Sequence, residues 1–198
     1  MSPRPDVSEE RKDQILEAAA DVFVEKGLQK SRMDDIVEKS GLSKGTLYWY
    51  FKSKDDIFIG IFERIFLKEA RDLEPLTSSD KSSSERIFEY TERVILDILR
   101  LLRFAPIAFE FLTLAFRTKY FQKSFKRYLA VHMDILIPII QQGVDSGEFR
   151  NIDAPEAAIA IGAIFEGTML LWVYDNDLVD PESHVRSGVE FLVAGFKQ

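Results

Sequence analysis

The residues best equipped for binding chemistry lie between Lys39 and Lys54. Four lysines stand at positions 39, 44, 52 and 54, and the stretch contains no Asp or Glu. A hydroxyl (Thr46) and two large aromatic side chains (Tyr48 and Trp49) stand among them. Ammonium and hydroxyl groups donate hydrogen bonds to phosphates and base edges, and apolar groups contact thymine methyls. The whole chain has a net charge of −7, so this positive charge is focused rather than general.

Other kinds of site find little support in the composition. The chain has no Cys and two His, His132 and His184, which stand far apart and outside any metal-binding spacing. It contains no nucleophile–base pair and no glycine-rich loop of the kind that holds phosphates. We therefore predict no catalytic residues, no metal and no cofactor, and we predict that the protein is not an enzyme.

Residues 32–51 have the layout of a helix-turn-helix. A short helix with an apolar inner face is followed by the turn Ser40-Gly41-Leu42 and by a second short helix that Ser43 can cap. Leu47 and Phe51 point inward in this pattern, and such a second helix is narrow enough for the major groove of DNA. The alternative is a helical hairpin with solvated lysines. The predicted outer positions are Lys44, Gly45, Thr46, Tyr48 and Trp49.

The remaining hydrophobic pattern is helical almost throughout. It predicts an all-α chain of about nine helices, with a polar loop at 77–84. Ser31 is expected to start the second helix, with Asp34 at the position of a capping-box acid. We predict a three-helix domain over residues 1–53, a linking helix over 54–74, and a larger helical domain over 75–198.

The most apolar stretch is Ala157–Val173, interrupted only by Glu166. It is slightly short for a membrane span and carries an acid at its middle, so we expect a buried helix and no membrane partner. The polar N-terminus lacks the apolar region of a signal peptide. These features predict a cytoplasmic protein.

Residues of about 12–62 closely resemble the DNA-binding domain of the TetR/AcrR family of bacterial transcriptional regulators. The rest of the chain is similar to the family in helix number, length and order. The matching residues are Ile15-Leu-Glu-Ala-Ala19, Val22-Phe23, Gly27, Met33-Asp-Asp-Ile-Val37, Ser40-Gly-Leu-Ser-Lys-Gly-Thr-Leu-Tyr48 and Tyr50-Phe-Lys-Ser-Lys54.

The resemblance implies roles for individual residues. Arg32, where the family often has Thr, would be a reader specific to this protein. Tyr48 and Tyr50 would contact phosphates or adjacent bases, and Lys54 would anchor a phosphate. The DNA-binding residues expected in this way are Ser31, Arg32, Ser43, Lys44, Gly45, Thr46, Tyr48, Trp49, Tyr50 and Lys54.

The resemblance also implies a function. We expect a nucleoid-associated repressor that binds double-stranded DNA at an inverted-repeat operator, as a homodimer joined by its last two helices. A small lipophilic effector, a cation or a long-chain acyl compound, would release it. The alternative is a helical dimeric interaction protein that keeps the fold without binding an operator.

Aromatic and acidic residues of the C-terminal domain are candidates for the effector site, although aromatic residues at helical spacing also form ordinary cores. Glu110 has Thr113 and Arg117 nearby and is expected to be satisfied by its own helix. Glu166 is expected to be a buried carboxylate that serves a structural role or meets a cationic ligand. The candidates are Phe104, Phe109, Glu110, Phe125, Phe165, Glu166, Met169 and Trp172.

Overall fold

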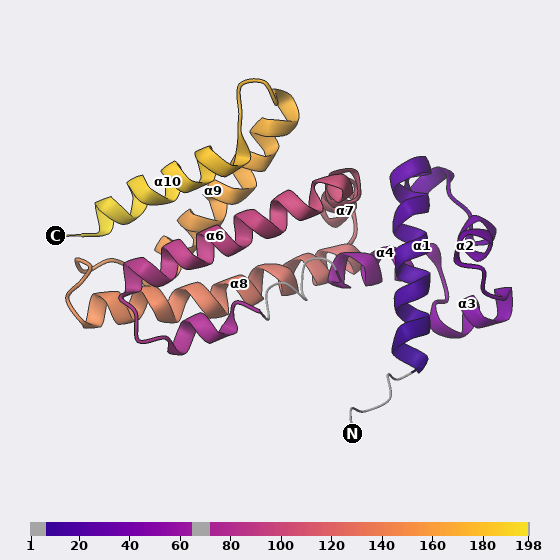
Figure 1. Ribbon diagram of the computed structural model, residues 1–198, viewed down its shortest axis with the longest axis horizontal. Coiled ribbons are helices and arrows are strands. Elements are labelled where there is room, and N and C mark those ends of the chain that lie inside the picture. The colour runs from indigo at the N-terminus through magenta and orange to yellow at the C-terminus, as the bar shows by residue number, and fades with distance from the viewer. Residues whose placement is uncertain (1–6, 65–71, 198) are drawn as a thin grey trace. The chain divides into compact units, whose positions relative to one another are not determined.

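The computed structural model describes residues 7–64 and 72–197, and all regular elements within them are helical (Figure 1). The predicted all-α fold is confirmed, with nine α-helices in this part of the chain. The α-helices are α1 (Val7–Lys30), α2 (Met33–Ser40), α3 (Lys44–Tyr50), α4 (Lys54–Phe62), α6 (Ser83–Leu101), α7 (Ala105–Arg117), α8 (Lys119–Asp145), α9 (Ala154–Tyr174) and α10 (Pro181–Phe196). Two short 3₁₀ helices are η2 (Glu74–Ser78) and η3 (Leu102–Phe104).

Side-chain caps fix where several of these helices begin. Ser43, Ser53, Asp153 and Asp180 each accept a hydrogen bond from the backbone N–H three residues further on. Such a cap satisfies one of the N–H groups that a helix start leaves without a partner, which is worth about 1 kcal/mol. The predicted starts of α3 and α4 therefore agree with the structure.

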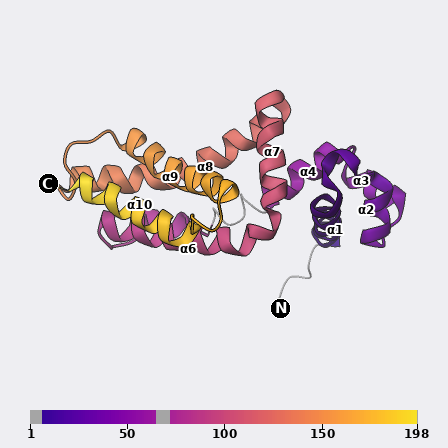
Figure 2. The same cartoon turned by 90° about the horizontal axis from the view of Figure 1, so that it is seen from above.

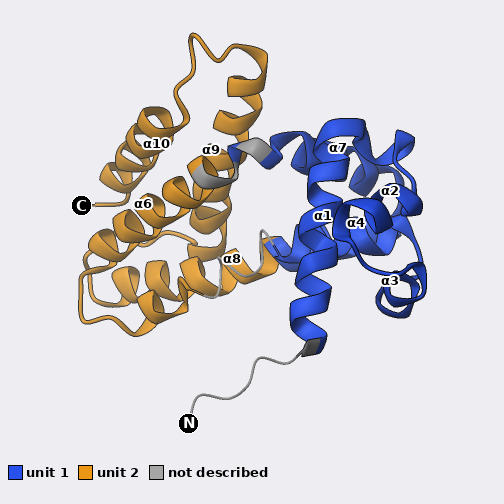
Figure 3. Cartoon of the chain, turned by 45° about the vertical axis from the view of Figure 1, so that its right-hand side comes forward, with its two compact units in different colours: residues 1–68, 101–128 blue, residues 69–100, 129–198 orange. Residues whose placement is uncertain are grey.

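The chain forms two compact units (Figure 3). Unit 1 comprises residues 1–68 and 101–128, and unit 2 comprises residues 69–100 and 129–198. Unit 1 thus takes in α7 and the first part of α8, whereas the predicted division placed everything after residue 75 together. The reason is aromatic packing: Phe62 of α4 stacks on Phe111 of α7 with ring centroids 3.8 Å apart. Phe58 also stacks on Phe111, so α4 shares one core with α7.

The structure describes the predicted linking helix over residues 54–74 only at its two ends. α4 runs over Lys54–Phe62, and residues 72–73 form a turn before η2. The middle of the predicted helix, residues 65–71, lies outside the described residues.

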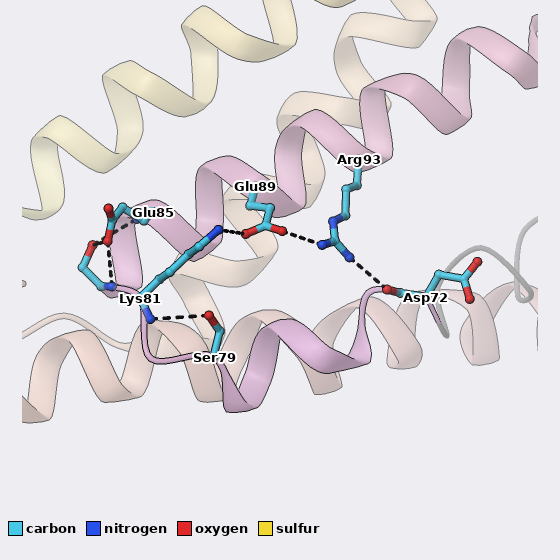
Figure 4. A network of polar contacts seen from close by, with 7 residues as sticks. Asp72, Ser79, Lys81, Glu85, Glu89 and Arg93 are labelled. Atoms are coloured by element: carbon cyan, nitrogen blue, oxygen red, sulfur yellow. Dashed lines mark hydrogen bonds and ion pairs between the residues drawn. The ribbon is translucent and has the colours of Figure 1, made fainter.

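Unit 2 is built from α6, α8, α9 and α10, which pack around one apolar core (Figure 2). α10 returns beside α9 so closely that a Cβ at Gly188 would lie 2.9 Å from Ile164. Polar contacts tie the segment before α6 to that helix (Figure 4). Glu89 accepts from Lys81 and from Arg93, and Arg93 also donates to the carbonyl of Asp72.

Candidate nucleic-acid interface

The orientation of α3 is set by its cap and by its two inward residues. The Ser43 Oγ accepts from the Thr46 N–H at 3.1 Å and lies 2.8 Å from the Thr46 hydroxyl. Leu47 is fully buried, and Phe51 is buried at the C-terminal end of the helix. Both belong to the core of unit 1, as predicted. Because this face is anchored, the opposite face of α3 points to solvent.

The solvent face of α3 carries the predicted groups. Lys44, Gly45, Tyr48 and Trp49 are exposed, and Trp49 leaves 68% of its surface accessible. Trp49 packs edge-to-face on Tyr50, with ring centroids 4.5 Å apart. Contact of this exposed indole with DNA stays a prediction. In Figures 1 and 2, α2 and α3 lie on one side of α1.

Two lysines near this face form ion pairs with aspartates of α2. Lys44 donates to Asp34 Oδ1 at 2.6 Å, and Lys26 donates to Asp35 Oδ1 at 2.9 Å. Hydrogen bonding to Asp34 raises the pKa of Lys44. Residues 39–54 contain no acid, but Asp34 of α2 brings a carboxylate to Lys44 in this stretch.

The start of α2 differs from the prediction by one residue. Arg32 is its N-cap, and the Arg32 N–H donates to Asp35 Oδ2 at 2.7 Å. The capping acid is therefore Asp35 and not Asp34. The hydrogen bond from Lys26, followed by that from the Arg32 backbone, lowers the pKa of Asp35. The side chain of Arg32 is exposed next to the N-terminus of α2.

Three predicted contact residues have structural partners. Ser31 is buried, and its hydroxyl donates to the Leu28 carbonyl at 2.8 Å. Lys54 Nζ donates to the carbonyls of Leu28 at 2.6 Å and Ser31 at 2.8 Å, so it fastens the start of α4 to the end of α1. Tyr50 is half-buried against the core, with its hydroxyl 3.5 Å from Ser8 Oγ. Contact of these three side chains with DNA stays a prediction.

Comparison with known proteins decides what this arrangement is. The family described as "Bacterial regulatory proteins, tetR family" matches residues 15–61. The HTH-type transcriptional regulator YfiR of Bacillus subtilis is 35% identical over 173 residues, which cover 81% of this chain and 78% of the relative. The chain belongs to the TetR family. It is therefore a DNA-binding transcriptional regulator of the helix-turn-helix class, with α2 and α3 as the motif.

Two further comparisons cover nearly the whole length of this TetR-family chain. The fatty acid metabolism regulator protein of B. subtilis is 27% identical over 191 residues, covering 92% of this chain and 93% of the relative. The crystal structure of the transcriptional regulator FadR from B. subtilis, solved with stearoyl-CoA, has a TM-score of 0.79 and 24% identity. That match covers 92% of this chain and 98% of the other.

The predicted effector residues of this TetR-family chain fall into different units. Phe104 is buried and Phe109, Glu110 and Phe125 are half-buried, all in unit 1. Phe165 is buried, Met169 and Trp172 are half-buried and Glu166 is exposed, all in unit 2. The two groups do not form one site within either unit. The division follows from α7 joining the core of α4.

The two acidic candidates have surroundings other than those predicted. Glu110 does not rely on its own helix, because its Oε2 accepts from the Leu28 N–H at 3.0 Å. Gly27, with φ of 72°, interrupts the regular helix of α1. The N–H of the following residue, Leu28, is the one that donates to Glu110. Glu166 is not fully buried in the single chain, because much of its surface is accessible on α9, yet the surrounding protein desolvates its carboxyl group and raises its pKa. Sequence spacing revealed neither arrangement.

Proposed function

We propose that the protein is a repressor that binds an inverted-repeat operator as a homodimer and leaves it on binding a lipophilic effector. The observation that carries this proposal is the outward presentation of α3 from a Ser43 cap and a buried Leu47. A two-fold dimer would offer two such helices to successive major grooves, about 34–36 Å apart. Its place of action would be the cytoplasm, where the DNA is.

The proposed dimer surface consists of apolar side chains on α9, α10 and the loop between them. Among the described residues, α9 is the one helix long and apolar enough to cross a membrane, yet only 28% of its 18-residue apolar window is buried in the single chain. The expectation of a buried helix is thus not met without a partner. A second copy of the chain would cover this surface and remove its contact with water. Its exposed residues are Ile159, Leu170, Leu171, Val173, Tyr174, Leu178 and Phe191.

The proposed effector is a long-chain acyl compound. Of the two classes left open by the sequence, the cation rests on Glu166 alone, a carboxyl group whose pKa is raised by desolvation. The acyl class gains from the similarity to a regulator named for fatty acid metabolism. Phe165 lies near Tyr90, whose hydroxyl is 2.6 Å from His132 Nδ1. This part of unit 2 therefore places two buried aromatic rings beside one polar pair.

The test is DNA binding measured by fluorescence anisotropy, with the DNA upstream of the protein's own gene. Operator binding predicts an affinity that falls steeply as salt rises, because phosphate contacts release counterions. Lys44→Ala should weaken binding and relax the preference at one base position by about 1–3 kcal/mol. A long-chain acyl thioester should lower the affinity, and a lipophilic cation should not. Absence of binding at low salt would favour the alternative of an interaction protein.

A further inference from the structure

The ion pair between Asp34 of α2 and Lys44 of α3 joins the two helices of the DNA-binding motif. Its atoms lie 2.6 Å apart, and both side chains are well exposed, 69% for Asp34 and 60% for Lys44. Exposed pairs of this kind contribute little to folding, because water screens both charges and two long side chains lose freedom. Folding stability therefore does not explain why this ion pair is present.

Asp34 is also not required for the start of α2. Asp35 accepts from the Arg32 N–H and from Lys26, so the capping role is already filled. That leaves Asp34 with one described partner, the first residue of the helix that faces DNA. An aspartate at this place puts a negative charge beside a surface that must receive a polyanion.

We propose that Asp34 is a specificity-determining residue that weakens binding to DNA other than the operator. The inference rests on the proposed function, because it concerns the same interface. On arbitrary DNA, the backbone phosphates attract Lys44 but repel Asp34, so separating the pair brings no net gain. In an operator, base edges offer partners to both: guanine accepts from a lysine, and the cytosine amino group donates to a carboxylate.

The experiment compares Asp34→Asn with the wild-type protein on two duplexes. One is the operator, selected by the wild-type protein from a random DNA pool, and the other is its scrambled version of equal composition. Dissociation constants are measured by anisotropy between about 50 and 200 mM salt. Asp134→Asn is the matched control, because Asp134 is an exposed aspartate of α8 in unit 2 and the change in net charge is the same.

For Asp34→Asn, we expect the affinity for scrambled DNA to rise about two- to fivefold per bound protomer, which is the worth of an exposed ion pair. The slope of log affinity against log salt should steepen by about 0.9 per protomer, because Lys44 then reaches a phosphate. Operator affinity should not rise, because the amide is a weaker acceptor for the cytosine amino group and this loss offsets the removal of one negative charge, so the ratio between the two duplexes falls. Asp134→Asn should leave that ratio unchanged.

Three results would overturn the inference. The first is a scrambled-DNA affinity that does not change, and the second is an equal rise on both duplexes. The third is a rise that persists when Lys44→Ala is combined with Asp34→Asn, since the effect would then not pass through the pair. Wild-type protein that fails to prefer any selected duplex would instead refute the proposed operator function. The thermal midpoint of Asp34→Asn should stay within about 4 °C of wild type, which excludes misfolding as a cause.

Discussion

The hydrogen bond between Glu110 and Leu28 connects positions 82 residues apart, and its removal should be measurable. Leu28 is buried, and its N–H follows the break in α1 at Gly27. Glu110→Ala leaves this donor without its carboxylate. A buried donor without an acceptor costs about 1–3 kcal/mol, so we expect the free energy of unfolding to fall by that amount. Glu110→Gln keeps an acceptor oxygen and loses the charge, which should cost about 1 kcal/mol.

Urea unfolding followed by circular dichroism measures both variants. Amide hydrogen exchange at Leu28 reports on the bond itself, and its protection should fall furthest in Glu110→Ala. Glu17→Ala is a suitable control, because Glu17 is an exposed glutamate on α1 and its loss should change stability by less than about 0.5 kcal/mol. The reasoning is refuted if Glu110→Ala unfolds like the control and exchange at Leu28 is unaltered.

Two other predictions concern unit 2. Burial lowers the pKa of His132 to about 4 from an ordinary 6.5, so the unfolded chain takes up this proton first as the pH falls. Stability should therefore decline between about pH 6.5 and pH 4, and His132→Gln should remove about 2 kcal/mol of that decline at pH 4.5 in urea unfolding. An identical pH dependence in the two proteins would contradict the assignment. Phe191, with 78% of its surface exposed on α10, should be covered in the dimer. Phe191→Glu should then shift sedimentation from dimer to monomer, while Glu190→Gln next to it should not; a dimeric Phe191→Glu protein would rule out this surface.

Much of the DNA-binding motif was predictable from the sequence, because its determinants are local. The Ser43 cap, the inward Leu47 and the turn at Gly41 lie within a few residues of one another, and the structure confirms each. Gly41 adopts φ of 67°, a left-handed conformation that glycine accepts without strain.

The electrostatics of the same motif was not predictable, because it depends on distances between helices. The stretch from Lys39 to Lys54 contains no acid, yet α2 supplies Asp34 to Lys44 across ten positions of sequence. The start of α2, which lies one residue later than predicted, decides that Asp35 caps the helix and that Asp34 pairs with Lys44. Spacing along a chain fixes neither the register of a helix start nor the approach of two helices.

The division of the effector candidates between two units was not predictable for a similar reason. Aromatic residues near 104–125 and near 165–172 share hydrophobic spacing, and that spacing does not say which core each joins. The stacking of Phe62 on Phe111 draws α7 into unit 1. A helical hydrophobic pattern shows which face of a helix is apolar, but it does not show which other helix packs against that face.

The pairing of lysines with acids at the motif has a consequence for how the protein finds its target. The chain has a net charge of −7, and aspartates already neutralise Lys26 and Lys44 in the free protein. The long-range electrostatic attraction between the protein and a DNA duplex should therefore be weak. Encounter should then proceed near the unsteered association rate, and sliding along arbitrary sequence should be brief. Search would rely on repeated short collisions, and occupancy of a target would be governed by how slowly the complex comes apart.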